Sequence, residues 1–180
     1  MLSLDNLHTL IGGIYDAAMD ADQWSGFLEI LGETFNAGPS MFLIQNLSSG
    51  EVPVMTGVRF DPGFIDSYVA YYASVNVWTQ REEAAPAGTV VTDQMLATDE
   101  ELVGSEFYND WLAPQDTRHA LGSVLIRNGN VISKLSILRS KRLGAFSDEE
   151  YRFWAQLIPH MQRAVQIYNQ FSMLETYRDA

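Results

Sequence analysis

Two stretches near the middle of the chain are rich in aromatic side chains with polar edges, the residue types from which small-molecule pockets are built. Their rings supply an apolar wall, while hydroxyl, indole and amide groups fix a ligand by hydrogen bonds. We expect six residues of these stretches to line a pocket: Tyr68, Tyr72, Asn76, Trp78, Phe107 and Trp111. The same spacing also fits an ordinary core between a sheet and its helices, and this alternative stays open.

Two serines complete the expected pocket from the side of a sheet. Alternation along the predicted strands 119–127 and 131–139 places Ser123 and Ser133 on one face among apolar residues. It places Lys134 on the other face, which we expect to lie nearer to solvent. Since a buried hydroxyl needs a partner, which can be the backbone, water or a ligand, we add both serines to the candidate ligand-binding residues.

Residues that could perform catalysis do not form a recognisable pattern. His8, His119 and His160 lack the spacing of metal ligands, and the chain has no cysteine. The sequence has no nucleophile elbow, no phosphate-binding glycine loop and no dinucleotide fingerprint. We therefore predict no catalytic residue, no metal site and no cofactor, and we do not expect an enzyme.

The charge and the hydropathy of the chain restrict its partners. Its 180 residues include 23 acidic and 11 basic side chains, and the net charge of -12 repels phosphate backbones. No stretch approaches the roughly 18 apolar residues of a membrane span, and the first residues do not resemble a signal peptide. We expect a cytoplasmic protein with no membrane contact and no direct nucleic-acid binding.

Hydrophobic periodicity predicts both helices and strands. Helices are expected at 4–18, at 24–35, from Asp61-Pro62 onward, at 105–113 and from Ser147 to the end of the chain. Strands are expected at 41–47, 52–58, 88–92, 119–127 and 131–139.

Three local signals sharpen the second half of this prediction. Asn128-Gly129 between two β-rich runs is typical of a hairpin, and Ser147 with Glu150 forms the capping box of the last helix. Pro159 lies inside that helix, where we expect a kink or a local break.

The order of these elements predicts an α+β fold. An antiparallel sheet of about five strands needs helices on both of its faces, and no internal repeat or composition break divides residues 1–180. We therefore expect a single domain, and its arrangement resembles that of PAS and GAF domains.

Several longer phrases point to a family. Leu10–Ala18, Tyr71–Trp78, Gly88–Val91, Ser105–Leu112 and Phe146–Glu150 together resemble the N-terminal sensory region of bacterial LuxR-type helix-turn-helix regulators. The resemblance covers nearly the whole chain, and Ser-Glu-Phe-Tyr-Asn-Asp-Trp-Leu at 105–112 is its most specific element. It implies a ligand-responsive or partner-responsive domain that precedes a DNA-binding domain.

The chain departs from the family in two ways. No helix-turn-helix pattern follows residue 147, so we expect contact with DNA only through an output domain that these residues do not include. Where relatives commonly have Asp-Pro-Trp, this chain has Asn76-Val77-Trp78. Because the carboxylate is missing, a ligand amine that depended on it would bind less well here.

These observations predict a small-molecule-sensing regulatory domain that couples ligand binding to a dimer or an output domain through its terminal helices. We expect a homodimer and a small-molecule ligand whose identity the sequence does not give. A ligand-free dimerisation or protein-interaction module is the alternative, with the aromatic residues as closed core. An enzyme on a ferredoxin-like or hotdog-like scaffold would need a histidine and a carboxylate to converge in a cleft.

Overall fold

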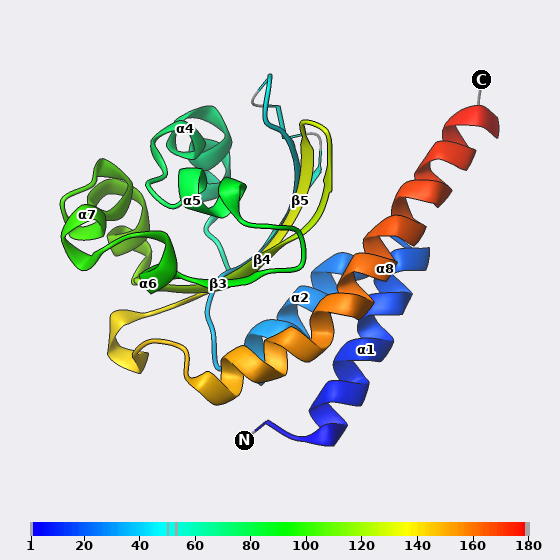
Figure 1. Ribbon diagram of the computed structural model, residues 1–180, viewed down its shortest axis with the longest axis horizontal. Helices are drawn as coiled ribbons and strands as arrows, with labels where there is room; N and C mark the ends of the chain where they lie inside the picture. Colours follow the sequence, from blue (N-terminus) through cyan, green and yellow to red (C-terminus); the bar gives the residue numbers. More distant parts are fainter. Residues whose placement is uncertain (1, 50, 53, 179–180) are drawn as a thin grey trace.

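Five antiparallel strands form one sheet at the centre of the molecule (Figure 1). The computed structural model describes residues 2–49, 51–52 and 54–178, with side chains described up to residue 170. The strands are β1 (Ser40–Asn46), β2 (Val54–Val58), β3 (Val90–Thr92), β4 (His119–Asn128) and β5 (Val131–Arg139), in the spatial order β2-β1-β5-β4-β3. The predicted five-stranded antiparallel α+β fold is confirmed. Residue 53 of the expected strand 52–58 lies outside the described residues.

Two helices, α2 (Gln23–Thr34) and α8 (Asp148–Arg178), pack on one face of the sheet, and α1 (Leu4–Met19) packs against both of them. Although α1 and α8 come from opposite ends of the chain, they lie side by side (Figure 1, blue and orange). The apolar side chains of the three helices share one core with alternate residues of the strands, including Phe42, Leu121, Leu135 and Ile137. This face of the sheet therefore forms the larger of two separate cores.

Short helical segments cover the opposite face (Figure 1, green). They are α3 (Pro62–Ser67), η1 (Tyr68–Tyr72), α4 (Ala73–Val75), α5 (Thr79–Ala84), α6 (Asp93–Leu96), α7 (Asp99–Val103), η2 (Phe107–Leu112) and η3 (Ala113–Gln115). A further turn, η4 (Lys141–Leu143), connects β5 to α8. The second core lies beneath these segments and uses the other strand residues, among them Leu43 and Leu138. Helices on both faces, as predicted, are confirmed.

Pro159 does not break α8, contrary to the expected local break. The helix is continuous from Asp148 to Arg178, with Pro159 inside it. Polar contacts fix it to β4 on both sides of the proline: Trp154 Nε1 donates to Ser123 Oγ (3.0 Å) and Gln162 Nε2 donates to the Leu125 carbonyl (2.8 Å). Tertiary packing thus outweighs the loss of one backbone donor. None of the described helices is long and apolar enough to cross a membrane.

A buried ion pair fixes the start of α8 to the end of β5. Arg139 donates to both carboxylate oxygens of Glu150 and to the carbonyl oxygen of Phe35 in the loop after α2. The predicted capping box is also present, because Glu150 N donates to Ser147 Oγ and Ser147 N donates to the Glu150 carboxylate. Burial raises the pKa of Glu150, but Arg139 and Ser147 outweigh it, so this pKa lies below its ordinary value.

Replacing Glu150 with Gln tests this ion pair without removing the capping group, since Gln also serves in a capping box. We expect the free energy of unfolding at pH 7 to fall by about 2–3 kcal/mol, because Arg139 stays buried with its charge uncompensated. The pKa of Glu150 is lower in the folded chain than in the unfolded chain, where it is about 4.3, so the ionised carboxylate stabilises the fold at pH values above about 4.3. This stabilisation is lost as the pH falls through the pKa of the folded state. Urea unfolding from pH 7 to pH 3 should therefore show the two proteins converging. The matched control is Glu149→Gln, because Glu149 is exposed and adjacent in sequence, and it should change the free energy of unfolding by less than about 0.5 kcal/mol. If Glu150→Gln remains less stable than the unaltered protein at acid pH, the ion-pair assignment is contradicted.

Candidate functional site

A small cavity lies between the sheet and the short helical segments. Its volume is about 40 Å³, enough for about three water molecules. The sheet contributes Met41, Leu43, Val91, Ala120, Gly122, Lys134, Ser136 and Leu138 to its lining. The helical side contributes Tyr68, Asn76, Trp78, Glu82, Leu96, Phe107 and Trp111. Five of the eight predicted ligand-binding residues are thus brought together around one cavity.

Two π-helical segments place the aromatic wall of this cavity. Tyr68 lies on η1, and Phe107 and Trp111 lie on η2. The rings of Phe107 and Trp111 are stacked with centroids 5.3 Å apart, and Tyr68 lies 5.0 Å from Trp111. Because Trp111 Nε1 donates to the Phe64 carbonyl (2.9 Å), its ring is held in place. Single π turns inside helices are rare and occur frequently at functional sites.

Asn76 organises the polar part of the helical side. Its Oδ1 accepts from the backbone nitrogen of Trp78 (2.9 Å), and its Nδ2 donates to the hydroxyl of Tyr68 (3.2 Å). Burial raises the pKa of Tyr68, so this phenol stays neutral. Trp78 is buried, and its Nε1 has no hydrogen-bond partner among the described residues. The cavity wall therefore contains an indole donor that no protein group uses.

The charged groups of the cavity are Lys134 and Glu82, and the sequence analysis did not predict either. Lys134 Nζ lies 3.0 Å from Glu82 Oε2, and only 6% and 12% of their side chains are exposed. Burial lowers the pKa of Lys134, but the nearby Glu82 carboxylate outweighs it and keeps this pKa above its ordinary value. The lysine is therefore a charged group inside the domain. A signal was present in the sequence, since Lys134 is the one charged residue between Val131 and Leu138, but its partner on α5 is 52 positions away.

The orientation expected for β4 and β5 is reversed in the structure. Ser123 and Ser133 do not line the cavity. Ser123 Oγ accepts from Trp154 of α8, while Ser133 Oγ accepts from the backbone of Ile126 (3.2 Å). Ser136 and Lys134 line the cavity instead, with Gly122 opposite Ser136. A Cβ at Gly122 would lie 2.8 Å from the Leu135 carbonyl oxygen, so the close approach of the two strands requires glycine.

Tyr72 is the third predicted residue that does not line the cavity. It is half-buried at the edge of the second core and packs edge-on against Tyr71, with ring centroids 5.2 Å apart. Its position follows from η1, where Tyr68 takes the inward place and Tyr72 lies at the other end of the same turn.

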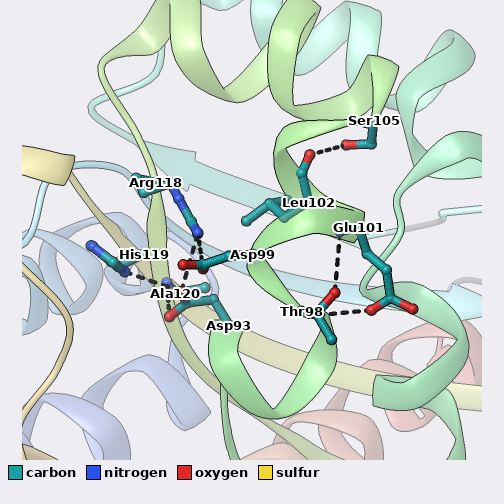
Figure 2. Close-up of polar contacts among 9 residues, drawn as sticks. All are labelled: Asp93, Thr98, Asp99, Glu101, Leu102, Ser105, Arg118, His119 and Ala120. Atoms are coloured by element: carbon teal, nitrogen blue, oxygen red, sulfur yellow. Dashed lines mark hydrogen bonds and ion pairs between the residues drawn. The ribbon is translucent and has the colours of Figure 1, made fainter.

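A second polar cluster joins the helical layer to the sheet beside the cavity (Figure 2). Asp93 at the start of α6 accepts from Arg118 Nη1 (3.3 Å) and from the backbone of Ala120 (3.2 Å), and it lies 3.0 Å from His119 Nδ1. Arg118 also pairs with Asp99 of α7. Ala120 lines the cavity, but Asp93, Arg118 and His119 do not. The cluster therefore positions the cavity wall without contributing to it.

The two aspartates that share Arg118 provide a matched test of this cluster. Asp93 is buried and Asp99 is exposed, with 88% of its side chain accessible. Asp93→Ala should lower the free energy of unfolding by about 3–5 kcal/mol, because Arg118 loses its buried counter-ion and the backbone nitrogen of Ala120 loses its acceptor. Asp99→Ala should cost about 0.5 kcal/mol or less, as surface pairs do. Chemical denaturation of both variants measures the difference, and similar losses would show that Arg118 depends on neither aspartate in particular.

The sheet order and the two helical layers place the chain in the GAF-like class of α+β domains. No protein-family model matches the sequence, and no curated protein is significantly similar to it. Solved structures, in contrast, match over most of the chain, and GAF domains are among them.

The ligand-binding domain of VqsR from Pseudomonas aeruginosa superposes with a TM-score of 0.72 at 17% identity, covering 91% of this chain and 96% of that one. CepR2 from Burkholderia cenocepacia, an N-acylhomoserine-lactone-dependent LuxR-family transcription factor, superposes with a TM-score of 0.65 at 12% identity, covering 90% of this chain and 94% of CepR2. A free methionine-R-sulfoxide reductase from Neisseria meningitidis superposes with a TM-score of 0.58 at 15% identity, covering 94% of this chain and 95% of the reductase. At these identities the likeness is one of fold, and at that level the LuxR-type resemblance of the sequence is confirmed.

Proposed function

We propose that this chain is the small-molecule-sensing domain of a LuxR-type transcription regulator and acts in the cytoplasm. The observation that carries the proposal is the cavity between the sheet and η2, which has an aromatic wall and buried hydrogen-bonding groups. A mostly apolar cavity with a few polar groups is what small-molecule recognition requires. The shared fold with LuxR-type ligand-binding domains supports this role.

Strand β4 connects the cavity to the terminal helix in this proposal. Ala120 and Gly122 line the cavity, while Ser123 and Leu125 of the same strand accept hydrogen bonds from Trp154 and Gln162 of α8. A ligand that displaces β4 changes the environment of α8, and it thereby shifts the population of two arrangements of this helix. In a longer regulator this helix would pass the change to an output domain.

We propose a regulatory and not an enzymatic role, although a reductase uses the same fold. The convergence that would favour an enzyme, a histidine next to a carboxylate, occurs at His119 and Asp93. Asp93, however, also binds Arg118 and the backbone of Ala120, and neither His119 nor Asp93 lines the cavity. The pair is therefore better explained as part of the contact between α6 and β4.

A test is native mass spectrometry of the protein as isolated, followed by thermal denaturation with and without any copurified molecule. We expect a bound molecule that raises the melting temperature. Ala120→Leu adds three carbons inside the cavity and should abolish binding while the protein stays folded. Ser123→Ala lies on the opposite face of the same strand and should retain the molecule, so its loss from both variants would argue against this cavity.

A ligand-free dimerisation or interaction module is the second candidate. The contact between the rings of Phe107 and Trp111 and the small volume of the cavity favour it. In this case no molecule copurifies with the protein, and Ala120→Leu has no effect on dimerisation or on binding of a partner.

For either candidate we propose a homodimer. The supporting observation is that α1, one of the terminal helices, exposes Leu4 and Met19 by 71% and 65%, apolar side chains that a second copy of the chain would bury. Sedimentation velocity measures the mass, and a monomer at all concentrations would exclude the dimer.

A further inference from the structure

Several hydrogen-bond donors in the cavity lining have hydrogens that no described protein group accepts. Lys134 Nζ has three hydrogens and makes one described hydrogen bond, to Glu82. Trp78 Nε1 makes none, and the hydroxyl of Tyr68 serves only as the acceptor for Asn76 among the described contacts. The side-chain oxygen of Asn76 is already bonded to the backbone of Trp78. A ligand that satisfies these donors must therefore supply acceptor oxygens, in competition with the carboxylate of Glu82.

We propose that the cavity recognises a small carboxylic acid, whose carboxylate binds Lys134 and Trp78 and whose apolar body lies against the aromatic wall. This inference rests on the proposed sensory function and names the chemical class of its ligand. Hydrogen bonds between charged groups are shorter and about twice as strong as neutral ones, so a carboxylate gains more from Lys134 than a carbonyl does. Trp78 supplies the second donor in a position from which water is largely excluded.

Glu82 is the competitor that makes this recognition switchable. In the absence of a ligand it is the counter-ion of Lys134, and its side chain at 12% exposure lies closer to the surface than that of Lys134 at 6%. A ligand carboxylate takes over the same ammonium group and repels Glu82. Since Glu82 lies on α5, its release loosens the contact of α5 with β5. Binding and the position of α5 are thus coupled through one lysine.

The size of the cavity limits the ligand. A volume of about 40 Å³ is smaller than either a short aliphatic acid or an aromatic acid, so both require the wall to move apart, the aromatic acid more than the aliphatic one. We therefore choose butyrate and benzoate as probes. Butyramide and benzamide have nearly the same shape without the charge, and they serve as matched controls.

Ligand-observed NMR on the full chain compares the four probes, because this method measures affinities down to the millimolar range. We expect each carboxylate to bind about tenfold or more tightly than its amide, as hydrogen bonds to charged groups predict. The Ala120→Leu variant should abolish the signal, which assigns it to the cavity. Trp78→Phe keeps the ring, removes the N–H donor and should weaken carboxylate binding about fivefold.

Charge variants separate recognition from stability. Lys134→Met alone leaves Glu82 without its partner, so the double variant Lys134→Met, Glu82→Gln is used, which removes both charges at nearly constant volume. It should stay folded and lose the preference for carboxylates over amides. Glu82→Gln alone removes the competitor, so carboxylates should bind it more tightly than the unaltered protein.

Three results would overturn the inference. Amides that bind as tightly as acids would show that the cavity selects neutral acceptors, and the sensory function would stand. If no probe binds while a copurified molecule is retained by the double variant, the ligand is of another class and the sensory function again stands. If no probe binds and nothing copurifies, both proposals fall.

Discussion

The central strands of the sheet are covered by helices on both faces, and this constraint governs every polar residue within them. The residues from Ala120 to Leu125 of β4 and from Ile132 to Leu135 of β5 are buried between the two helical layers. Each buried donor or charge therefore needs a partner from a helix or a neighbouring loop. Ser123 accepts a hydrogen bond from Trp154, Lys134 forms an ion pair with Glu82, and Arg139 forms an ion pair with Glu150.

These polar contacts determine where the helices lie more than how stable the domain is. Replacing a buried ion pair by apolar groups is often neutral, whereas removing one partner is costly, so such pairs mainly fix geometry. Arg139 fixes the start of α8, and Arg118 fixes α6 against β4. Lys134 fixes α5 in the same way, but it does so inside the cavity. That location is what distinguishes it from the other two cations.

The sequence predicted the fold well because most of its signals are local. Helix caps such as Asp61 and Ser147 and the hairpin at Asn128-Gly129 depend on neighbouring residues, and all are found in the structure. The aromatic wall was predicted in large part because rings in the family-like stretches fall on η1 and η2. The ligand-binding role of these residues stays a prediction.

The orientation of the last two strands was not predictable from alternation alone. Alternation shows that Ser133 and Lys134 face opposite ways, but it does not show which face is solvent. Lysine is rarely buried unless it is paired, so by sequence alone Lys134 indicates the solvent-facing side of the strand. Its pairing with Glu82, and the position of β5 at the centre of the sheet, depend on contacts distant in sequence. A bulge between Val124 and Ile126 further changes the register opposite Ser133.

The small volume of the cavity is compatible with a sensor, because a ligand shifts an equilibrium only by binding two states with different affinity. A molecule that entered a fully open pocket without moving any group would produce no signal. Here the rings of Phe107 and Trp111 are in contact, and the charges of Lys134 and Glu82 are paired, so an occupant must displace something. The displaced groups lie on η2 and α5, and the floor of the cavity is the strand that holds α8. The same closed packing that stabilises the ligand-free domain is therefore what would convert binding into a change of structure.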